Sequence, residues 1–335
     1  MDKKKLLLID GSSVAFRAFF ALYQQLDRFK NANGLHTNAI YGFQLMLNHV
    51  LERVDPSHVL VAFDAGKTTF RTEMYADYKG GRAKTPDEFR EQFPFIRELL
   101  DHLGIRHYEL AQYEADDIIG TLGRLAEKDS FDVTIVSGDK DLIQLTDEHT
   151  VVEISKKGVA EFEAFTPDYL MEKMGLTPAQ FIDLKALMGD KSDNIPGVTK
   201  IGEKTGIKLL LEHGSLEGIY ENIDGMKASK MKENLINDKE QAFLSKTLAT
   251  IETNAPIEIG LDDLLYSGPD VENLGKFYDE MGFKQLKQAL NASQANQSET
   301  LNFTMVDKVS QDMLSADSIF HFELFGENYH TDDLV

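Results

Sequence analysis

Cysteine is absent from the 335-residue chain, which excludes disulfides, thiolate catalysis and zinc sites built on cysteine. The nine histidines show neither a His-x-x-x-His nor a His-Glu-x-x-His spacing, so a zinc hydrolase is disfavoured. A Gly-x-Ser-x-Gly nucleophile motif is missing as well. The side chains that remain for chemistry are mainly carboxylates and bases.

Long apolar runs are also missing. The opening run, Leu6–Ile9, is too short for a signal peptide, and no later run approaches the 18 residues of a membrane span. We therefore expect a cytoplasmic protein without a membrane partner.

Positive charge is scarce, because 35 Lys and Arg residues stand against 56 Asp and Glu residues and give a formal net charge of −21. The field of the whole molecule repels polyanions. Any contact with nucleic acid must then use local basic patches. The excess of acidic residues requires a separate explanation.

Short apolar strands alternate with amphipathic helices in the first half of the chain. The runs Lys5–Ile9, Val59–Phe63 and Asp132–Val136 are strand-like, and Thr37–Glu52 is helical with apolar residues at steps of three and four. Short connections and right-handed crossovers favour an α/β fold with a mainly parallel sheet flanked by helices. Val151–Phe165 is expected to form a hairpin.

The domain organisation follows from where strand signals stop. Helices dominate from Thr166 onward, and a polar stretch follows residue 290. We expect an α/β core at 1–175, a helical subdomain at 176–290, a linker at 291–300 and the incomplete start of another domain at 301–335.

Nine carboxylates end or follow apolar segments and could face one crevice beyond the carboxyl ends of the strands. Two such charges about 4 Å apart repel by roughly 4 kcal/mol at an effective dielectric constant of 20. Oxygen ligands select Mg²⁺ or Mn²⁺, and two such ions support phosphodiester cleavage. The alternative for each acid alone is an ordinary turn or helix cap. The nine are Asp10, Asp64, Glu114, Asp116, Asp117, Asp139, Asp141, Asp190 and Asp193.

The segment from Lys67 to Lys84 holds five basic residues against two acids, with aromatic residues between them. Composition alone favours an exposed charged loop. Its position just after Asp64 favours a role in holding a phosphate backbone and stacking unpaired bases. Its basic and aromatic members include Arg71, Tyr75, Tyr78, Lys79, Arg82 and Lys84.

The stretch Gly197–Thr205 allows two interpretations besides a plain glycine turn. A phosphate-binding loop needs lysine after Gly202, where Glu203 stands, and a preceding strand, which is absent. A helix-hairpin-helix fits better, since its turn presents backbone N–H groups to a DNA phosphate. Lys200 and Lys204 add positive charge.

Six ordered motifs together resemble the 5′-nuclease domains of bacterial DNA polymerases I, which are relatives of the flap endonucleases. The resemblance covers about residues 1–290. The motifs are Leu8–Ser12, Ala62–Asp64, Tyr75-x-x-Tyr78-Lys79-x-x-Arg82, Glu114–Asp117, Ser137–Asp141 and Gly189–Gly197.

This resemblance implies two Mg²⁺ ions, replaceable by Mn²⁺. Asp10, Asp64, Glu114, Asp116 and Asp117 would serve the first ion, and Asp139, Asp141, Asp190 and Asp193 the second.

Residues 67–90 would form a helical arch over the 5′ single strand, with Lys79 and Arg82 neutralising the scissile phosphate. The helix-hairpin-helix, at about 190–213, would grip the duplex and could seat K⁺. Gly206 departs from the family, which usually has alanine there. The further residues expected to contact DNA are Arg71, Tyr75, Tyr78, Lys84, Gly197, Lys200, Gly202, Lys204 and Thr205.

The implied activity is that of a monomeric, Mg²⁺-dependent, structure-selective 5′ nuclease. It would remove RNA primers and 5′ flaps from nicked or branched duplex DNA during replication and repair, in a chain continuous with a polymerase. The tail resembles the start of a 3′-5′ exonuclease-like domain, but His321–Phe325 offers only Glu323 of the expected acid pair, so no proofreading is predicted. The alternatives are a non-catalytic DNA-junction binder and a small-molecule phosphohydrolase.

Overall fold

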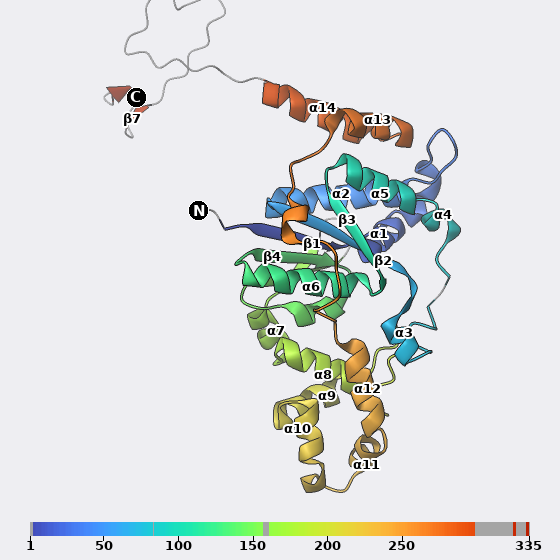
Figure 1. Cartoon of the computed structure of the whole chain (residues 1–335), viewed down its shortest axis with the longest axis vertical. Coiled ribbons are helices and arrows are strands. Elements are labelled where there is room, and N and C mark those ends of the chain that lie inside the picture. The colour runs from blue at the N-terminus through green and yellow to red at the C-terminus, as the bar shows by residue number, and fades with distance from the viewer. Residues whose placement is uncertain (1–2, 83, 157–160, 299–323, 326–332, 335) are drawn as a thin grey trace, which may run out of the picture. The chain divides into compact units, whose positions relative to one another are not determined.

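The computed structural model describes residues 3–82, 84–156, 161–298, 324–325 and 333–334 (Figure 1). The chain divides into one compact unit, Met1–Leu290, and a second, Asn291–Val335. In the second unit, β7 (Leu324–Phe325) pairs antiparallel with β8 (Asp333–Leu334). The prediction about Glu323 lies outside the described residues.

A sheet of six strands stands at the centre of the first unit, in the order β3-β2-β1-β4-β5-β6. The first five strands pair in parallel and β6 runs antiparallel to β5. The expected α/β class and the Val151–Phe165 hairpin are confirmed. The strands are β1 (Lys5–Asp10), β2 (His58–Thr69), β3 (Arg106–Gln112), β4 (Asp132–Ser137), β5 (Thr150–Ser155) and β6 (Phe162–Phe165).

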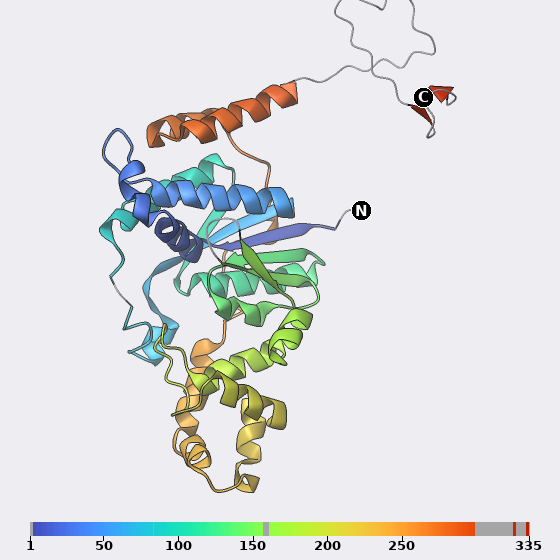
Figure 2. The ribbon, with the colours of Figure 1, turned by 180° about the vertical axis from the view of Figure 1, so that it is seen from behind.

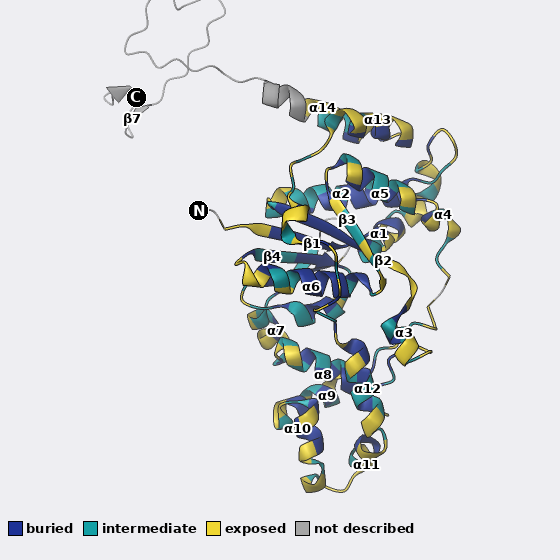
Figure 3. Ribbon diagram, in the orientation of Figure 1, coloured by how far each residue is buried: buried dark blue, intermediate teal, exposed yellow. Residues whose placement is uncertain are grey.

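Strand β1 is buried on both faces because helices cover the sheet on each side. Leu7 and Ile9 pack into the core under α1, α2 and α5, whereas Leu6 and Leu8 pack into the core under α6. Figure 1 and Figure 2 show these two helical layers, and Figure 3 shows the buried strands between them. The helices are α1 (Gly11–Ala21), α2 (Asn38–Val54), α5 (Phe93–His102) and α6 (Ala115–Lys128).

A third core holds the helical part together and includes Leu187 of α8 and Leu210 of α9. Thr166 and Thr177 cap helices that begin with proline. The helices of this part are α7 (Pro167–Met174), α8 (Pro178–Met188), α9 (Glu203–His213), α10 (Leu216–Glu221), α11 (Lys230–Asn237) and α12 (Lys239–Ala249).

The last helices differ from the expectation that residues 176–290 form one helical subdomain. Phe277 of α13 (Val271–Met281) and Phe283 pack into the core under α2 and α5, so the chain returns to the α/β part. Helix α14 (Lys284–Ser298) also runs into the predicted 291–300 linker.

The basic segment differs from the predicted helical arch. Strand β2 runs to Thr69, and among the described residues of 67–90 only α3 (Phe70–Met74) and α4 (Asp87–Arg90) are helical. More than half of the described residues of this segment are exposed, but Tyr78 is buried in a small core with Ile195 and Leu248. The segment is therefore anchored to the molecule at a few buried positions.

Short 3₁₀ turns complete the fold at η1 (Tyr23–Arg28), η2 (Lys140–Leu145), η3 (Ile223–Gly225) and η4 (Leu261–Leu264). Within the described ranges, no helix has both the length and the apolar character needed to cross a lipid bilayer.

Candidate active site

The order of strands in the sheet brings the first acids together. From β1 the chain moves outward to β2 and β3 on one side and later to β4 and β5 on the other. The β1/β4 edge is thus a switch point, where ligands bind beyond the carboxyl ends of the strands. Asp10 ends β1, and Asp139 follows the end of β4 at Ser137.

Ser137 links these two acids. Its hydroxyl donates a hydrogen bond to Asp10 Oδ2 at 2.7 Å and accepts one from the backbone N–H of Asp139 at 2.9 Å. Asp10 also caps α1 by accepting from the N–H of Ser13 at 3.0 Å. Both carboxylates are thereby oriented by the ends of secondary structure.

The N-terminus of α6 adds two more acids to this edge. Glu114 caps the helix, and Asp116 lies in its first turn, where the helix dipole favours negative charge. The N–H of Ala115 donates to Asp64 Oδ1 at 3.0 Å, which ties β2 to the same helix end. Four acids from four elements therefore form one group, the first acid group: Asp10, Asp64, Asp116 and Asp139.

Burial and mutual repulsion act on the first acid group. Burial, followed by the charge of Asp64, raises the pKa of Asp10 to about 7. Burial and then the charges of Asp10 and Asp139 raise the pKa of Asp116 well above its usual range. In the described part of the chain, the ion pairs of this region involve other acids than the four of the first acid group. The charge of Lys79 partly opposes the rise in the pKa of Asp116. The first acid group therefore lacks a direct ion-pair partner among the described residues.

Lys79 and Arg82 form ion pairs with two other predicted ligands, Glu114 and Asp193. Lys79 Nζ lies 2.8 Å from Glu114 Oε1 and 3.8 Å from Asp193 Oδ2. An Arg82 guanidinium nitrogen lies 2.5 Å from Asp193 Oδ1. The backbone N–H of Lys79 donates to the carbonyl of Asp193 at 2.8 Å, so the basic segment is docked on the loop that carries Asp193.

Tyr78 is placed differently from the prediction that it contacts DNA. It is buried, and its hydroxyl donates to Glu114 at 3.2 Å and to Asp193 at 3.4 Å. Burial and the charges of these two acids raise the pKa of Tyr78, which keeps the hydroxyl a donor. In this structure Tyr78 therefore holds two acids in place, and its contact with DNA stays a prediction.

Asp117, predicted as a metal ligand, and Arg71, predicted as a DNA contact, are paired with each other in this structure. Both are buried, with residue exposures of 0% and 2%. They form a bidentate ion pair with N···O distances of 2.7 and 2.8 Å. Arg71 also donates to the carbonyls of Leu248 and Thr250, and Asp117 accepts from the N–H of Glu252. Both carboxylate oxygens of Asp117 thus accept hydrogen bonds from other parts of the protein.

Lys185 of α8 was not singled out in the sequence. Its Nζ lies 2.6 Å from Asp141 Oδ1 and also pairs with Asp190. Burial and then Asp139 raise the pKa of Asp141 to about 6. Burial alone would raise the pKa of Asp190, but hydrogen bonds from Lys185 and Ser192 lower it to about 2. The only signal in the sequence was a lysine one turn before the Gly189–Asp190 motif.

The predicted ligands have the oxygen donors that a divalent ion needs. Their spacing in this structure does not yet form a binding site. Among the described residues, no three Asp, Glu or His side chains already form a ready-made ligand set. Several acids instead hold the basic side chains named above. The donors are all oxygen, and the first acid group carries surplus charge, which suits a hard cation such as Mg²⁺.

The hairpin between α8 and α9 depends on two glycines in the left-handed region. Gly189 has φ 70° and Gly197 has φ 63°. A Cβ on Gly197 would lie 2.2 Å from the backbone nitrogen of Gly189. The backbone segments at Gly189 and Gly197 therefore cross in direct contact, which only glycine allows. Gly197 is buried, so this structure shows a packing role for it, and its DNA contact stays a prediction.

The outer part of the hairpin is exposed where the sequence predicts DNA contacts. Gly202 caps α9, and Lys200, Gly202 and Lys204 are exposed while Thr205 is half-buried. The carbonyls of Gly197 and Thr199 already accept amide hydrogen bonds from Gln241 and Asn234, so these two oxygens do not require K⁺.

Gly206 has a packing explanation. A Cβ there would lie 2.7 Å from Leu184 Cδ1, so glycine lets α9 approach α8 closely.

The remaining residues of the basic segment differ in exposure. Tyr75 is partly buried against the small core around Tyr78. Lys84 is exposed over 76% of its side chain and lies 3.3 Å from Asp87. The side chain of Lys84 is therefore accessible to a ligand. The side chain of Tyr75 is accessible only in part.

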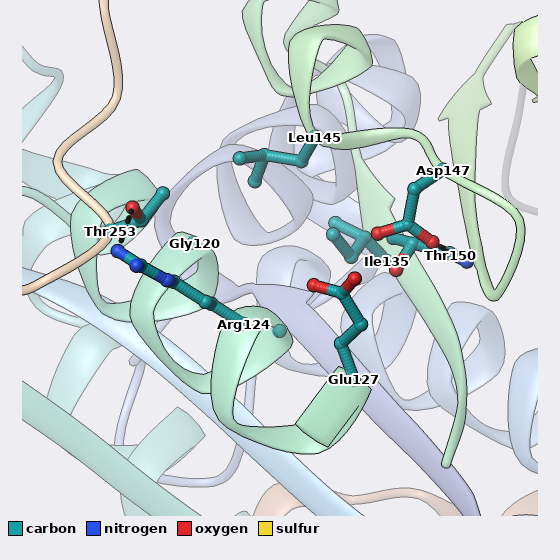
Figure 4. A pocket seen from close by; sticks show the side chains of 9 residues that line it. Gly120, Arg124, Glu127, Ile135, Leu145, Asp147, Thr150 and Thr253 are labelled. Atoms are coloured by element: carbon teal, nitrogen blue, oxygen red, sulfur yellow. Dashed lines mark hydrogen bonds between the residues drawn. The ribbon is translucent and has the colours of Figure 1, made fainter. Parts of the chain in front are cut away.

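A separate hollow of about 220 Å³ lies beside α6 (Figure 4). Arg124 at its rim donates to Asn254 at 2.7 Å, and Glu127 and Asp147 lie at another side. The described residues that line it include none of the predicted site residues. This hollow is therefore distinct from the acidic centre.

Two family models match consecutive parts of the chain. Residues 5–175 match the N-terminal resolvase-like domain of 5′-3′ exonucleases, and residues 176–272 match their C-terminal SAM fold. The chain belongs to the 5′-3′ exonuclease family. Residues 273–290, which complete the core under α2 and α5, follow both matched ranges.

Curated relatives of this exonuclease chain carry the name DNA polymerase I. The chain is 90% identical over 335 residues to that of Streptococcus pneumoniae and 50% identical over 339 residues to that of Bacillus subtilis. Each match covers 100% of this chain but only 38% of the relative.

Solved structures share the fold. The T5 5′-exonuclease with bound zinc ions has a TM-score of 0.63 at 22% identity, with 83% of this chain and 100% of that chain covered. The catalytic core of Rad2 in complex with a DNA substrate has a TM-score of 0.56 at 18% identity, with 86% and 91% covered. At these identities the likeness concerns the fold alone.

Proposed function

We propose that this chain is a Mg²⁺-dependent, structure-selective 5′ nuclease that trims 5′ flaps and RNA primers from duplex DNA. The observation that carries the proposal is the first acid group, four carboxylates from four elements without an ion-pair partner among the described residues, with Lys79 and Arg82 paired to the further acids Glu114 and Asp193. In the relatives named DNA polymerase I, this part would work in one chain with a polymerase.

Metal ions bound to these carboxylates would supply an activated nucleophile and the positive charge that phosphodiester hydrolysis needs. We assign the ions to Asp10, Asp64, Asp116 and Asp139, with Glu114, Asp141, Asp190 and Asp193 completing the set. Mn²⁺ should substitute for Mg²⁺, because both prefer oxygen ligands.

Basic side chains then have a second partner. Lys79 and Arg82 pair with Glu114 and Asp193 in this structure. With divalent ions bound to those carboxylates, the side chains of Lys79 and Arg82 would be free to donate charge-assisted hydrogen bonds to the scissile phosphate.

Duplex recognition is assigned to the exposed hairpin. Lys200 and Lys204 and the backbone at Gly202 lie at the start of α9, where they can contact phosphates without reading bases. Junction shape and a bendable backbone would then select the substrate.

The test is cleavage of a labelled 5′-flap duplex in Mg²⁺. Asp139→Asn should lower the rate by more than about 100-fold, because even changes outside the direct ligands cost 10–100-fold. The matched control is Asp132→Asn, at the opposite end of β4, where Asp132 pairs with Lys3. Equal cleavage by wild type and Asp139→Asn would reject the site, and tight flap binding without turnover would favour a non-catalytic junction binder.

A further inference from the structure

Lys185 occupies the space between two acids that come from different segments. Asp141 lies in η2 after β4, and Asp190 lies in the loop after α8. Lys185 contacts both, and only 14% of its side chain is exposed. One ammonium group thus joins the two carboxylates where a cation is needed.

The predicted metal ligands differ in whether a lysine or arginine pairs with them. In the second acid group, defined as Asp141, Asp190 and Asp193, each member has a basic partner: Lys185 holds the first two, and Arg82 holds the third. The members of the first acid group, in contrast, form no ion pair with a lysine or arginine among the described residues, whose ion pairs in this region involve other acids.

We propose that Lys185 is a built-in counter-ion of the second metal position, which holds Asp141 and Asp190 together and must yield before a divalent ion can bind there. The inference rests on the proposed function and adds a regulatory element to it. A lysine head is a compact charge on a flexible stem, so it can leave these oxygens without moving α8. Its departure opposes metal binding, and the second ion should bind more weakly than the first.

A matched lysine exists outside the site. Lys246 of α12 also bridges two acids, Asp183 and Glu217, each at 2.7 Å, with 28% of its side chain exposed. It shares the chemistry of Lys185 but contacts none of the predicted ligands among the described residues. Lys246→Met therefore controls for the loss of a bridging lysine as such.

The experiment is calorimetric titration of the metal-free full chain with Mn²⁺ alone, without DNA. Wild type should show one tighter and one weaker site. Lys185→Met and Lys185→Gln should each tighten the weaker site by at least about tenfold, because a charge within 4–6 Å shifts ionic equilibria by 1–3 log units. Lys185→Arg should retain the wild-type isotherm, and Lys246→Met should leave both sites unchanged.

Melting temperatures give a second readout. Without metal, Lys185→Gln should melt below wild type, because two neighbouring carboxylates lose their partner. Saturating Mn²⁺ should raise the melting temperature of Lys185→Gln by more than it raises that of wild type.

The inference is overturned if both Lys185→Met and Lys185→Gln bind the second Mn²⁺ with wild-type affinity or more weakly. It is also overturned if Lys246→Met tightens that site equally. These outcomes differ from failure of the proposed function, which would appear in wild type as flap duplex left uncut under the same Mn²⁺ concentration.

Discussion

The first and second acid groups are built from the same residue types but differ in their cations. Asp10, Asp64, Asp116 and Asp139 form no ion pair in the described part of the chain, whereas Asp141, Asp190 and Asp193 each hold a lysine or arginine. Burial and Asp139 still raise the pKa of Asp141 to about 6, so its ion pair with Lys185 does not remove the repulsion there. The difference shows that basic side chains from distant segments, and not only the number of carboxylates at a strand edge, set the local charge.

The largest effect is expected beneath the acids, at the buried Arg71–Asp117 pair. Arg71→Met should destabilise the protein by about 3–5 kcal/mol, because it leaves a buried carboxylate without its partner. The free energy of unfolding in urea measures this. Arg71→Met combined with Asp117→Leu should recover part of the loss, and a single variant as stable as wild type would contradict the structural role.

A comparison of neighbouring helix positions separates ligand from support. Asp116→Asn should lower flap cleavage by more than about 100-fold with little change in stability, because Asp116 is half-buried and serves the first acid group. Asp117→Asn should instead lower the melting temperature strongly. Single-turnover rates and thermal melts of both variants check this, and equal stability losses would blur the distinction.

The second acid group can be disturbed through its backbone. Gly197→Ala should cost about 1–3 kcal/mol for the left-handed backbone alone, with more from the contact at Gly189. Denaturant unfolding measures this loss of stability. Gly202→Ala is the stability control, since a Cβ there meets nothing within 4 Å; an equal loss of stability in the two variants would show that the crossing of Gly189 and Gly197 is unimportant.

The smallest expected effect is a pH dependence of the metal-free protein. Asp10 and Asp141 have pKa values raised to about 7 and about 6, above the ordinary 3.8. Between about pH 4 and 7 the folded state therefore binds more protons than the unfolded state, so stability falls as pH rises. Melting temperatures should drop by a few degrees across this range, and Mg²⁺ should remove the drop. A flat metal-free profile would contradict the surplus charge.

The parts of the fold that sequence could predict are those encoded locally. Strand β1 and its terminal Asp10, helix α2 and the proline-started helices α7 and α8 all follow from apolar periodicity and caps. The order of acids after strands then predicted that Asp10 and Asp139 lie at the same edge of the sheet, as they do in this structure.

The remaining features depend on distant partners. Arg71 and Asp117 are 46 positions apart, and Lys185 and Asp141 belong to different elements, so no periodicity reveals either pairing. The composition of the Lys67–Lys84 segment predicts an exposed loop. Tyr78 nevertheless packs against Ile195 and Leu248, which are far away in the sequence. The return of α13 to the α/β core is likewise a tertiary contact without a local signal.

The most direct test of the metal centre is anomalous diffraction from crystals grown with Mn²⁺. A peak within about 2.5 Å of carboxylate oxygens of Asp10 and Asp139, with Asp64 and Asp116 around it, is the predicted result. A Mn²⁺-saturated crystal whose peaks all lie away from these four carboxylates would contradict it.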